Sequence, residues 1–302
     1  MKTLIALLTV LPTALLAPAG GPTAAESKIA VVAAENFYAD VAGQIGGDHV
    51  AVASILSNPD QDPHLFEVSP AVVRKTAAAQ IVIYNGAGYD PWMAKLLAAT
   101  PKPERIVIVA ADLMHKKAGD NPHLWYDPAA IPAVATALAA ALADIDPAHQ
   151  DDYAARLKTF LASLAPIEQK IAAIRGRYAG VPVTATEPVY GSMAAALGLT
   201  MRNERFQLAV MNATEPSAGD VAAFQRDLTE HKVRLMFYNK QAIDNTVRRF
   251  IALAHSAHVP VVGVTETCPP GLSYQDWMLS ELNATEQALA LAAPPSSASL
   301  TP

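Results

Sequence analysis

The sequence has little of what would place it in several large classes of protein. Its 302 residues include one cysteine, Cys268, which excludes an internal disulfide, a zinc site of four cysteines and a CxxC redox pair. Lys and Arg number 22 against 28 Asp and Glu, with no basic run, so nucleic acid is not expected as a partner. We find no Gly-rich phosphate loop, GxSxG elbow, HExxH helix or calcium loop. Any metal ion would therefore be bound mainly by His, Asp or Glu.

The first 25 residues have the layout of a secretory signal peptide. Lys2 is followed by an apolar run from Leu4 to Leu16 and then by small residues up to Ala25. The run is shorter than the ~20 apolar residues of a spanning helix, which argues against a membrane anchor. Because no cysteine lies near the cleavage point, we expect a mature protein without a lipid anchor, free in the periplasm or outside the cell.

Apolar runs alternate with Ala-rich segments in both halves of the chain, and 52% of all residues are hydrophobic. Continuous apolar runs separated by helices are typical of buried parallel strands. We therefore predict an α/β protein of two lobes, residues 26–146 and 181–292, each with a parallel β-sheet flanked by helices. A tail at 293–302 is expected to be disordered. The runs are 28–34, 51–56, 81–84 and 106–109 in the first half, and 181–185, 233–238 and 259–264 in the second.

One long amphipathic helix is predicted between the lobes, over residues 147–180. Apolar side chains recur there at alternating spacings of four and three, from Tyr153 to Ile174. At ~1.5 Å per residue, a helix of roughly 30 residues reaches ~45 Å, enough to run along both lobes. Pro166 is expected to kink it. The alternative is a long core helix of one domain.

Two histidines stand in nearly the same local sequence, His64 within residues 62–66 (DPHLF) and His123 within 121–125 (NPHLW). Proline fixes φ and keeps the preceding residue out of the α region, so each histidine is presented from a stiff loop. Two imidazoles that face one cleft suit a transition metal. The alternative is a pair of ordinary loop histidines. The remaining six have no such partner sequence and are expected to be solvated: His49, His115, His149, His231, His255 and His258.

Two glutamates follow predicted strands of the second lobe, Glu187 in TEP and Glu266 in TETCPP. Loops beyond the carboxyl ends of strands are where α/β folds place ligands, so both are candidate metal ligands. The alternative for each is a solvated side chain or a helix cap.

Together these segments resemble the solute-binding proteins of manganese, zinc and iron ABC transporters, whose lobes are joined by one rigid helix. Residues 62–70 (DPHLFEVSP) match a recurring family motif, and 121–128 (NPHLWYDP) match a second one, with Asn121 in place of the usual Asp. Asn85-Gly86 and Trp92 resemble the segment that follows the third strand in the family. The likeness extends over nearly all of the mature chain.

The resemblance implies a metal site of His64, His123, Glu187 and Glu266. Glu187 stands where the family commonly has histidine and its manganese-type members have glutamate, and Glu266 stands where it usually has aspartate. Tyr190, Tyr238 and Asn239 are candidates to orient these ligands.

The implied function is capture of a divalent transition metal ion and its delivery to an ABC-type membrane permease, by a monomer. Four protein ligands leave little room for the open position of a catalytic metal, so we expect a carrier and not an enzyme. Two imidazoles and two carboxylates favour Mn²⁺ or Fe²⁺, with Zn²⁺ close behind. The alternatives are a periplasmic metal-dependent hydrolase that uses the same residues, and an adhesin-type interaction protein.

Overall fold

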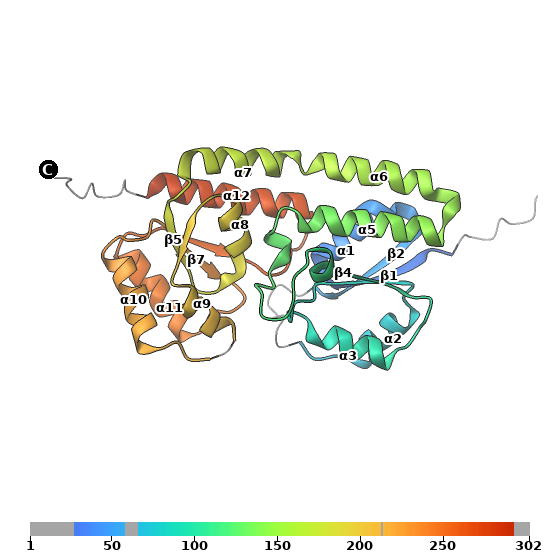
Figure 1. Cartoon of the computed structure of the whole chain (residues 1–302), viewed down its shortest axis with the longest axis horizontal. Coiled ribbons are helices and arrows are strands. Elements are labelled where there is room, and N and C mark those ends of the chain that lie inside the picture. The colour runs from blue at the N-terminus through green and yellow to red at the C-terminus, as the bar shows by residue number, and fades with distance from the viewer. Residues whose placement is uncertain (1–26, 58–65, 213, 293–302) are drawn as a thin grey trace, which may run out of the picture.

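The computed structural model describes residues 27–57, 66–212 and 214–292 (Figure 1). The predicted signal peptide, the predicted tail 293–302 and His64 lie outside the described residues. Within the described ranges, none of the helices is long and apolar enough to cross a membrane.

The N-terminal lobe is a parallel four-stranded sheet with the order β2-β1-β3-β4. Its apolar runs form these strands because both faces of the sheet are covered by helices. The strands are β1 (Ile29–Glu35), β2 (Val50–Leu56), β3 (Ile81–Tyr84) and β4 (Ile106–Val109). The helices are α1 (Asn36–Gly46), α2 (Pro70–Ala78), α3 (Pro91–Ala99), α4 (Ala110–Leu113) and α5 (Ala130–Ile145).

The C-terminal lobe repeats this design, with the parallel order β6-β5-β7-β8. The predicted fold class is thereby confirmed, but one strand, β6, was not predicted. It has three residues at the sheet edge, none of them buried, so it lacks the apolar run of the others. The strands are β5 (Pro182–Ala185), β6 (Thr200–Arg202), β7 (Met236–Asn239) and β8 (Val261–Val264). The helices are α8 (Gly191–Ala196), α9 (Glu204–Met211), α10 (Ala218–Thr229), α11 (Asn245–Ser256) and α12 (Tyr274–Leu291).

The joining helix consists of two segments, α6 (Gln150–Ser163) and α7 (Ala165–Tyr178), which lie end to end along both lobes (Figure 1). The interruption falls at Leu164, two residues before Pro166, because proline has no N–H for the helical ladder. α12 packs against α7. The predicted long joining helix is therefore confirmed, with its interruption at Leu164, close to the kink predicted at Pro166.

The two lobes are fastened directly to each other as well as through α6 and α7. The Asn36 side chain donates to the Cys268 carbonyl at 2.7 Å and accepts from the Cys268 N–H at 2.9 Å. Tyr126 donates to the Thr265 carbonyl at 2.7 Å. One apolar cluster also runs through both lobes, from Ile29 to Leu289. A wide hinge opening would break all of these contacts.

Candidate metal centre

Three of the four predicted ligands come together between the lobes, in loops beyond the carboxyl ends of strands. His123 precedes the short helix η3 (Leu124–Tyr126), Glu187 follows β5, and Glu266 follows β8. Nε2 of His123 lies 3.5 Å from Oε2 of Glu266. The structure does not describe His64.

Asn121 fixes the orientation and the tautomer of His123. Its Oδ1 lies 2.7 Å from Nδ1 of His123 and also accepts the His123 backbone N–H at 3.1 Å. Its Nδ2 donates to the Pro188 carbonyl of the other lobe at 2.8 Å. Because that carbonyl can only accept, Nδ2 faces it and Oδ1 faces the imidazole, whose Nδ1 must carry the proton. The lone pair of the neutral ring is then on Nε2, the atom that points toward Glu266.

The asparagine in place of the family's aspartate thus has a structural reason. A carboxylate accepts the imidazole N–H equally well, but it has no hydrogen to donate to the Pro188 carbonyl across the lobe boundary. Gly191 permits the close approach, since a Cβ at this position would lie 2.9 Å from Nδ2 of Asn121.

Asn239, the last residue of β7, connects the two glutamates. Its Nδ2 donates to Oε2 of Glu187 and to Oε1 of Glu266, at 2.6 Å each. Its own Oδ1 accepts the Gln241 N–H at 2.9 Å, which holds the amide in place. One buried amide therefore holds both carboxylates close together, and Oε2 of Glu266 faces His123.

The loop that carries Glu266 is held by Gln241. Oε1 of Gln241 accepts the backbone N–H groups of Glu266 at 2.6 Å and Thr267 at 3.1 Å. These hydrogen bonds satisfy two buried donors of the loop and set the direction of the Glu266 side chain.

The site is enclosed by aromatic rings. His123 and Glu266 are each 1% exposed, and Tyr89 and Trp125 lie edge-on to the imidazole at centroid distances of 6.0 and 5.4 Å. Burial raises the pKa of Tyr89 well above its usual range, and the Glu266 carboxylate raises it further. The phenol therefore stays protonated and is a hydrogen-bond donor toward that carboxylate.

A tight turn after β3 supports the His123 loop from behind. Asn85 donates to the Pro122 carbonyl at 2.7 Å and accepts from Tyr38 at 2.9 Å. The turn is closed by Asp90, which accepts the N–H groups of Asn85 and Gly86 at 2.7 and 2.8 Å. Burial raises the pKa of Asp90 to about 6.

A second buried carboxyl, that of Glu35 at the end of β1, lies beside Asp90. Burial, followed by the charge of Asp90, raises the pKa of Glu35 well above its usual value. The charge of Asp90 thus disfavours ionisation of Glu35, whereas the hydrogen bond with Glu35 lowers the pKa of Asp90 and partly offsets the effect of its burial.

Comparison with known proteins identifies the family. The model of the family described as periplasmic zinc-uptake complex component A, ZnuA, matches residues 31–288. The chain belongs to the ZnuA family. This is a family of solute-binding proteins and not of enzymes, which agrees with the predicted carrier and removes the hydrolase alternative.

Two relatives and one solved structure show the range of this ZnuA-family likeness. The manganese ABC transporter substrate-binding lipoprotein PsaA of Streptococcus mitis is 22% identical over 291 residues, 88% of this chain and 91% of PsaA. The metal ABC transporter substrate-binding lipoprotein ScbA of Streptococcus cristatus is 29% identical over 157 residues, so the match spans about half of each protein, 48% and 50%. The structure of the periplasmic zinc binding protein TroA from Treponema pallidum superposes with a TM-score of 0.72 at 17% identity, over 88% of this chain and 100% of TroA. At that identity the structural likeness shows the fold alone.

The two tyrosines predicted to orient ligands lie in different surroundings from Asn239. Tyr190 is buried, with its ring 4.7 Å from Phe237 and 5.0 Å from Tyr126, and its hydroxyl 3.4 Å from Oγ1 of Thr285. Its described contacts are thus those of a core residue. Tyr238 is half-buried, with its ring against Gly263.

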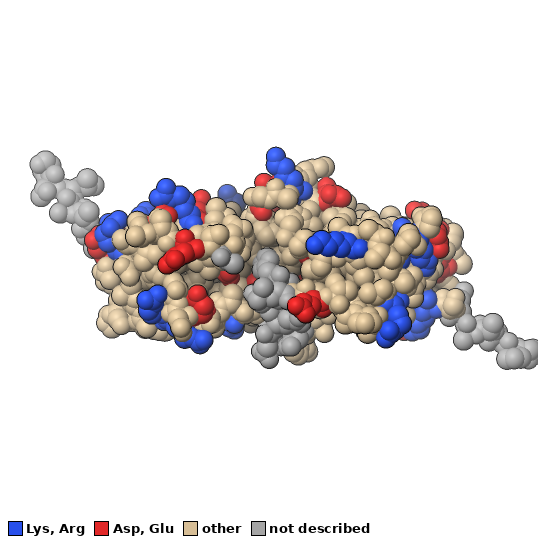
Figure 2. Space-filling view, turned by 90° about the horizontal axis from the view of Figure 1, so that it is seen from below, with Lys and Arg blue, Asp and Glu red and all other residues tan. Residues whose placement is uncertain are grey.

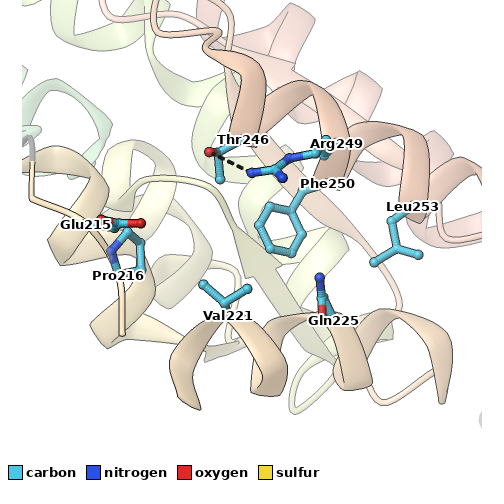
Figure 3. Close-up of a pocket in the computed structure, with 8 residues that line it drawn as sticks. All are labelled: Glu215, Pro216, Val221, Gln225, Thr246, Arg249, Phe250 and Leu253. Atoms are coloured by element: carbon cyan, nitrogen blue, oxygen red, sulfur yellow. Dashed lines mark hydrogen bonds between the residues drawn. The ribbon is translucent and has the colours of Figure 1, made fainter. Parts of the chain in front are cut away.

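A hollow of about 160 Å³ lies between α10 and α11 of this ZnuA-family chain, apart from the candidate metal centre (Figure 3). Val221, Phe250 and Leu253 give it an apolar wall, and Arg249 at its side donates to Thr246 at 3.4 Å. On the face seen in Figure 2, acidic and basic side chains of the described residues are interspersed over both lobes.

Proposed function

We propose that the chain captures a divalent transition metal ion between its lobes and delivers it to an ABC-type membrane permease, with Mn²⁺ or Fe²⁺ favoured and Zn²⁺ close behind. The ligands would be His123, Glu187 and Glu266, with His64 as the fourth. The observation that carries the proposal is the single amide of Asn239, which binds both carboxylates, one of which lies 3.5 Å from Nε2 of His123.

The chemistry of the donor set supports a cation as the solute. Two carboxylates joined by one buried amide would bring a charge of −2 to the site, and the ionised form of the buried one, Glu266, is costly unless a positive charge compensates it. A divalent ion supplies that charge. The imidazole is already in the tautomer that a metal requires, since Asn121 holds the Nδ1 proton.

The donor set also bears on the choice of metal. Carboxylate oxygens suit Mn²⁺ and Fe²⁺, and a carboxylate that binds through both oxygens raises the coordination number above the four typical of zinc. Zinc still binds more tightly in vitro by the Irving–Williams order. The name of the family model and that of TroA mention zinc, and that of PsaA mentions manganese.

Capture and release would proceed with small movements of loops. The contacts that fasten the lobes, such as Asn36 with Cys268, oppose a large closure of one lobe on the other. We expect only modest shifts around Glu187 and Glu266, because hydrogen bonds with Gln241, Tyr126 and Asn36 hold the Glu266 loop. Contact with the permease would release the ion by moving these loops, and protons would compete for the histidines at low pH.

The test is titration of metal-free protein with Mn²⁺, Zn²⁺ and, without oxygen, Fe²⁺. We expect one tightly bound ion per chain, and a loss of affinity in Glu187→Gln, Glu266→Gln and His64→Ala that exceeds the ~10–100-fold typical of lost outer-shell partners. Glu230→Gln is the matched control, because this carboxylate is half exposed and pairs with Lys232.

Uptake of radioactive Mn²⁺ and Zn²⁺ by cells with and without the chain tests delivery. Uptake that is lost without the chain, and not restored by Glu266→Gln, supports the carrier. Tight binding that is indifferent to Glu187→Gln and Glu266→Gln would refute the site. Binding to a host protein that survives loss of His64 would favour the adhesin instead.

We also propose that the mature chain is free in the periplasm. PsaA and ScbA are named as lipoproteins, but this sequence has no cysteine before Cys268. The mass of the protein released from the periplasm should correspond to a start after Ala25, and recovery with the membranes would contradict this.

A further inference from the structure

Three side chains of types that commonly bind metals lie together near the amino end of β2, in the N-terminal lobe. His49 ends the short helix η1 (Gly47–His49) just before β2 begins. Asp146 precedes the turn η4 (Pro147–His149) between α5 and α6, and His149 is its last residue. The candidate metal centre lies beyond the carboxyl ends of strands, whereas His49 lies at the amino end of β2. Figure 1 shows the junction of α5 and α6 at the end of this lobe that points away from the C-terminal lobe.

The three side chains are in mutual contact. The rings of His49 and His149 stack with their centroids 4.0 Å apart and an interplanar angle of 29°. Nδ1 of His149 lies 2.7 Å from Oδ2 of Asp146. One ligand atom from each of the three residues falls within 4.8 Å of the other two. The two imidazole side chains are 22% and 25% exposed, so they are enclosed but accessible to an ion from solvent.

The carboxylate of this cluster is oriented by a neighbour. Tyr153 in the first turn of α6 donates to Oδ2 of Asp146 at 2.8 Å. This hydrogen bond, together with His149, holds the pKa of Asp146 below its usual value. The carboxylate is thus ionised and directed toward the rings, as an outer-shell hydrogen bond directs a metal ligand.

The charges that face the cluster come from several elements. Asp152 of α6 lies 3.4 Å from Nε2 of His49. An adjoining hollow of about 440 Å³ is lined by His49 and Asp146 together with Asp48, Lys28 and Gln80. The guanidinium of Arg156 lies near Gly47. Three carboxylates therefore stand against two cations, and the local charge is negative.

A turn contact explains only part of this arrangement. Asp146 and His149 are three residues apart, so their contact is local to η4. His49 comes from a distant part of the sequence, and its ring stacks on His149. A shared cation would give that contact a chemical reason, because a metal ion binds the neutral form of each imidazole.

We propose that His49, Asp146 and His149 form a second metal site, distinct from the one between the lobes, which takes a borderline divalent ion such as Zn²⁺. At ~2.0–2.1 Å from each donor, tetrahedral zinc holds its ligand atoms ~3.3 Å apart. To reach that geometry, the ligand atoms, now within 4.8 Å of one another, would move closer, and the two stacked rings would turn so that each points a nitrogen at the ion. Water would complete the coordination, which makes this site weaker and faster to exchange than one closed by four protein ligands.

The test is titration of the tag-free, metal-free chain with Zn²⁺, and with Co²⁺ for its visible absorption. The natural chain should bind a second, weaker equivalent. His149→Ala and Asp146→Asn should weaken that equivalent by more than tenfold, a larger effect than the lower bound of ~10-fold for an outer-shell partner. His255→Ala is the matched control, because His255 is an exposed histidine in the last turn of α11.

Nitrogen NMR of the imidazoles gives a second readout that does not depend on counting ions. The ring signals of His49 and His149 should shift together in the weaker phase of the titration, and Asp146→Asn should abolish the joint shift while the fold stays intact. A weaker equivalent that is equal in the natural chain and in His149→Ala would overturn the proposal, and so would rings that do not respond.

This site does not rest on the proposed function. In Glu266→Gln the weaker equivalent should persist while the tight one is lost. If His149→Ala keeps only the tight equivalent, and Glu266→Gln removes that tight equivalent, the weaker ion binds at the second site and the stronger one binds between the lobes. Failure of either site is therefore visible separately.

Discussion

Glu281 of α12 should make the protein less stable as the pH rises from 5 to 8. Its carboxyl accepts from Tyr126 at 2.5 Å, from the Trp277 indole at 3.0 Å and from the Thr265 N–H at 3.2 Å. Burial nevertheless raises its pKa from 4.5 to about 7. The folded state therefore binds this proton more tightly than the unfolded state, and the resulting stability is full below pH 4.5 and is lost as the pH rises toward 7.

The size of the effect follows from the pKa values of Glu281 in the folded and unfolded states. When these two pKa values differ by one, the free energy of unfolding changes by about 1.4 kcal/mol. Integrating the linkage between pH 5 and pH 8 gives a loss of roughly 2.5 kcal/mol in the free energy of unfolding. Glu281→Gln should remove this slope, since the amide oxygen accepts from Trp277 and Thr265, and its NH₂ donates to Tyr126.

Urea unfolding of metal-free protein at pH 5 and pH 8 measures this difference. The variant should gain roughly 2.5 kcal/mol relative to the natural chain between the two pH values. The buried Asp90 adds the same slope to both proteins, so it cancels. Glu286→Gln, on the same helix, is the control, because Lys170 and Arg177 lower the pKa of Glu286 and it stays ionised throughout. Parallel stability curves for Glu281→Gln and the natural chain would refute the reasoning.

Three further predictions concern the site and the cysteine. Asn239→Leu should weaken metal binding by ~10–100-fold, because both glutamates lose the amide that positions them, and titration with Mn²⁺ measures this; unchanged affinity would contradict it. Asn121→Ala should weaken binding in the same range, whereas Asn121→Asp should lose less, since it keeps the acceptor for Nδ1 of His123; equal losses in the two variants would show that this acceptor is unimportant. Cys268 is buried, and burial raises its pKa to about 12, so a thiol reagent should react with it only after unfolding in urea; rapid labelling of folded protein would be inconsistent with the structure.

Much of the fold was predictable because each apolar run reports a strand that is buried on both faces. Strand β6 was not, because it has only three residues at one sheet edge, and none of them is buried. The interruption of the joining helix could be predicted from Pro166, because a proline lacks the N–H of a helical hydrogen bond whatever surrounds it.

The site was predictable as a set of residues but not as a geometry. Glu187 and Glu266 could be named from strand ends and from the resemblance, yet nothing in the sequence shows that one amide joins them. The two hydrogen bonds of Asn121 depend on Pro188 in the other lobe. His49 and His149 were expected to be solvated, but their side chains are only 22% and 25% exposed, because the two rings stack although they are distant in sequence.

The apolar cluster that runs through both lobes makes the molecule one thermodynamic unit despite its two-sheet appearance. A lobe expressed alone would expose the rings that normally pack across the boundary, such as Trp277 against Phe37 at 5.8 Å and against Tyr126 at 5.7 Å. Heat or urea should therefore melt both sheets in a single cooperative transition. An ion bound between the lobes would then raise the melting temperature of the entire chain, so a ligand that touches a few loops can be detected by following either sheet.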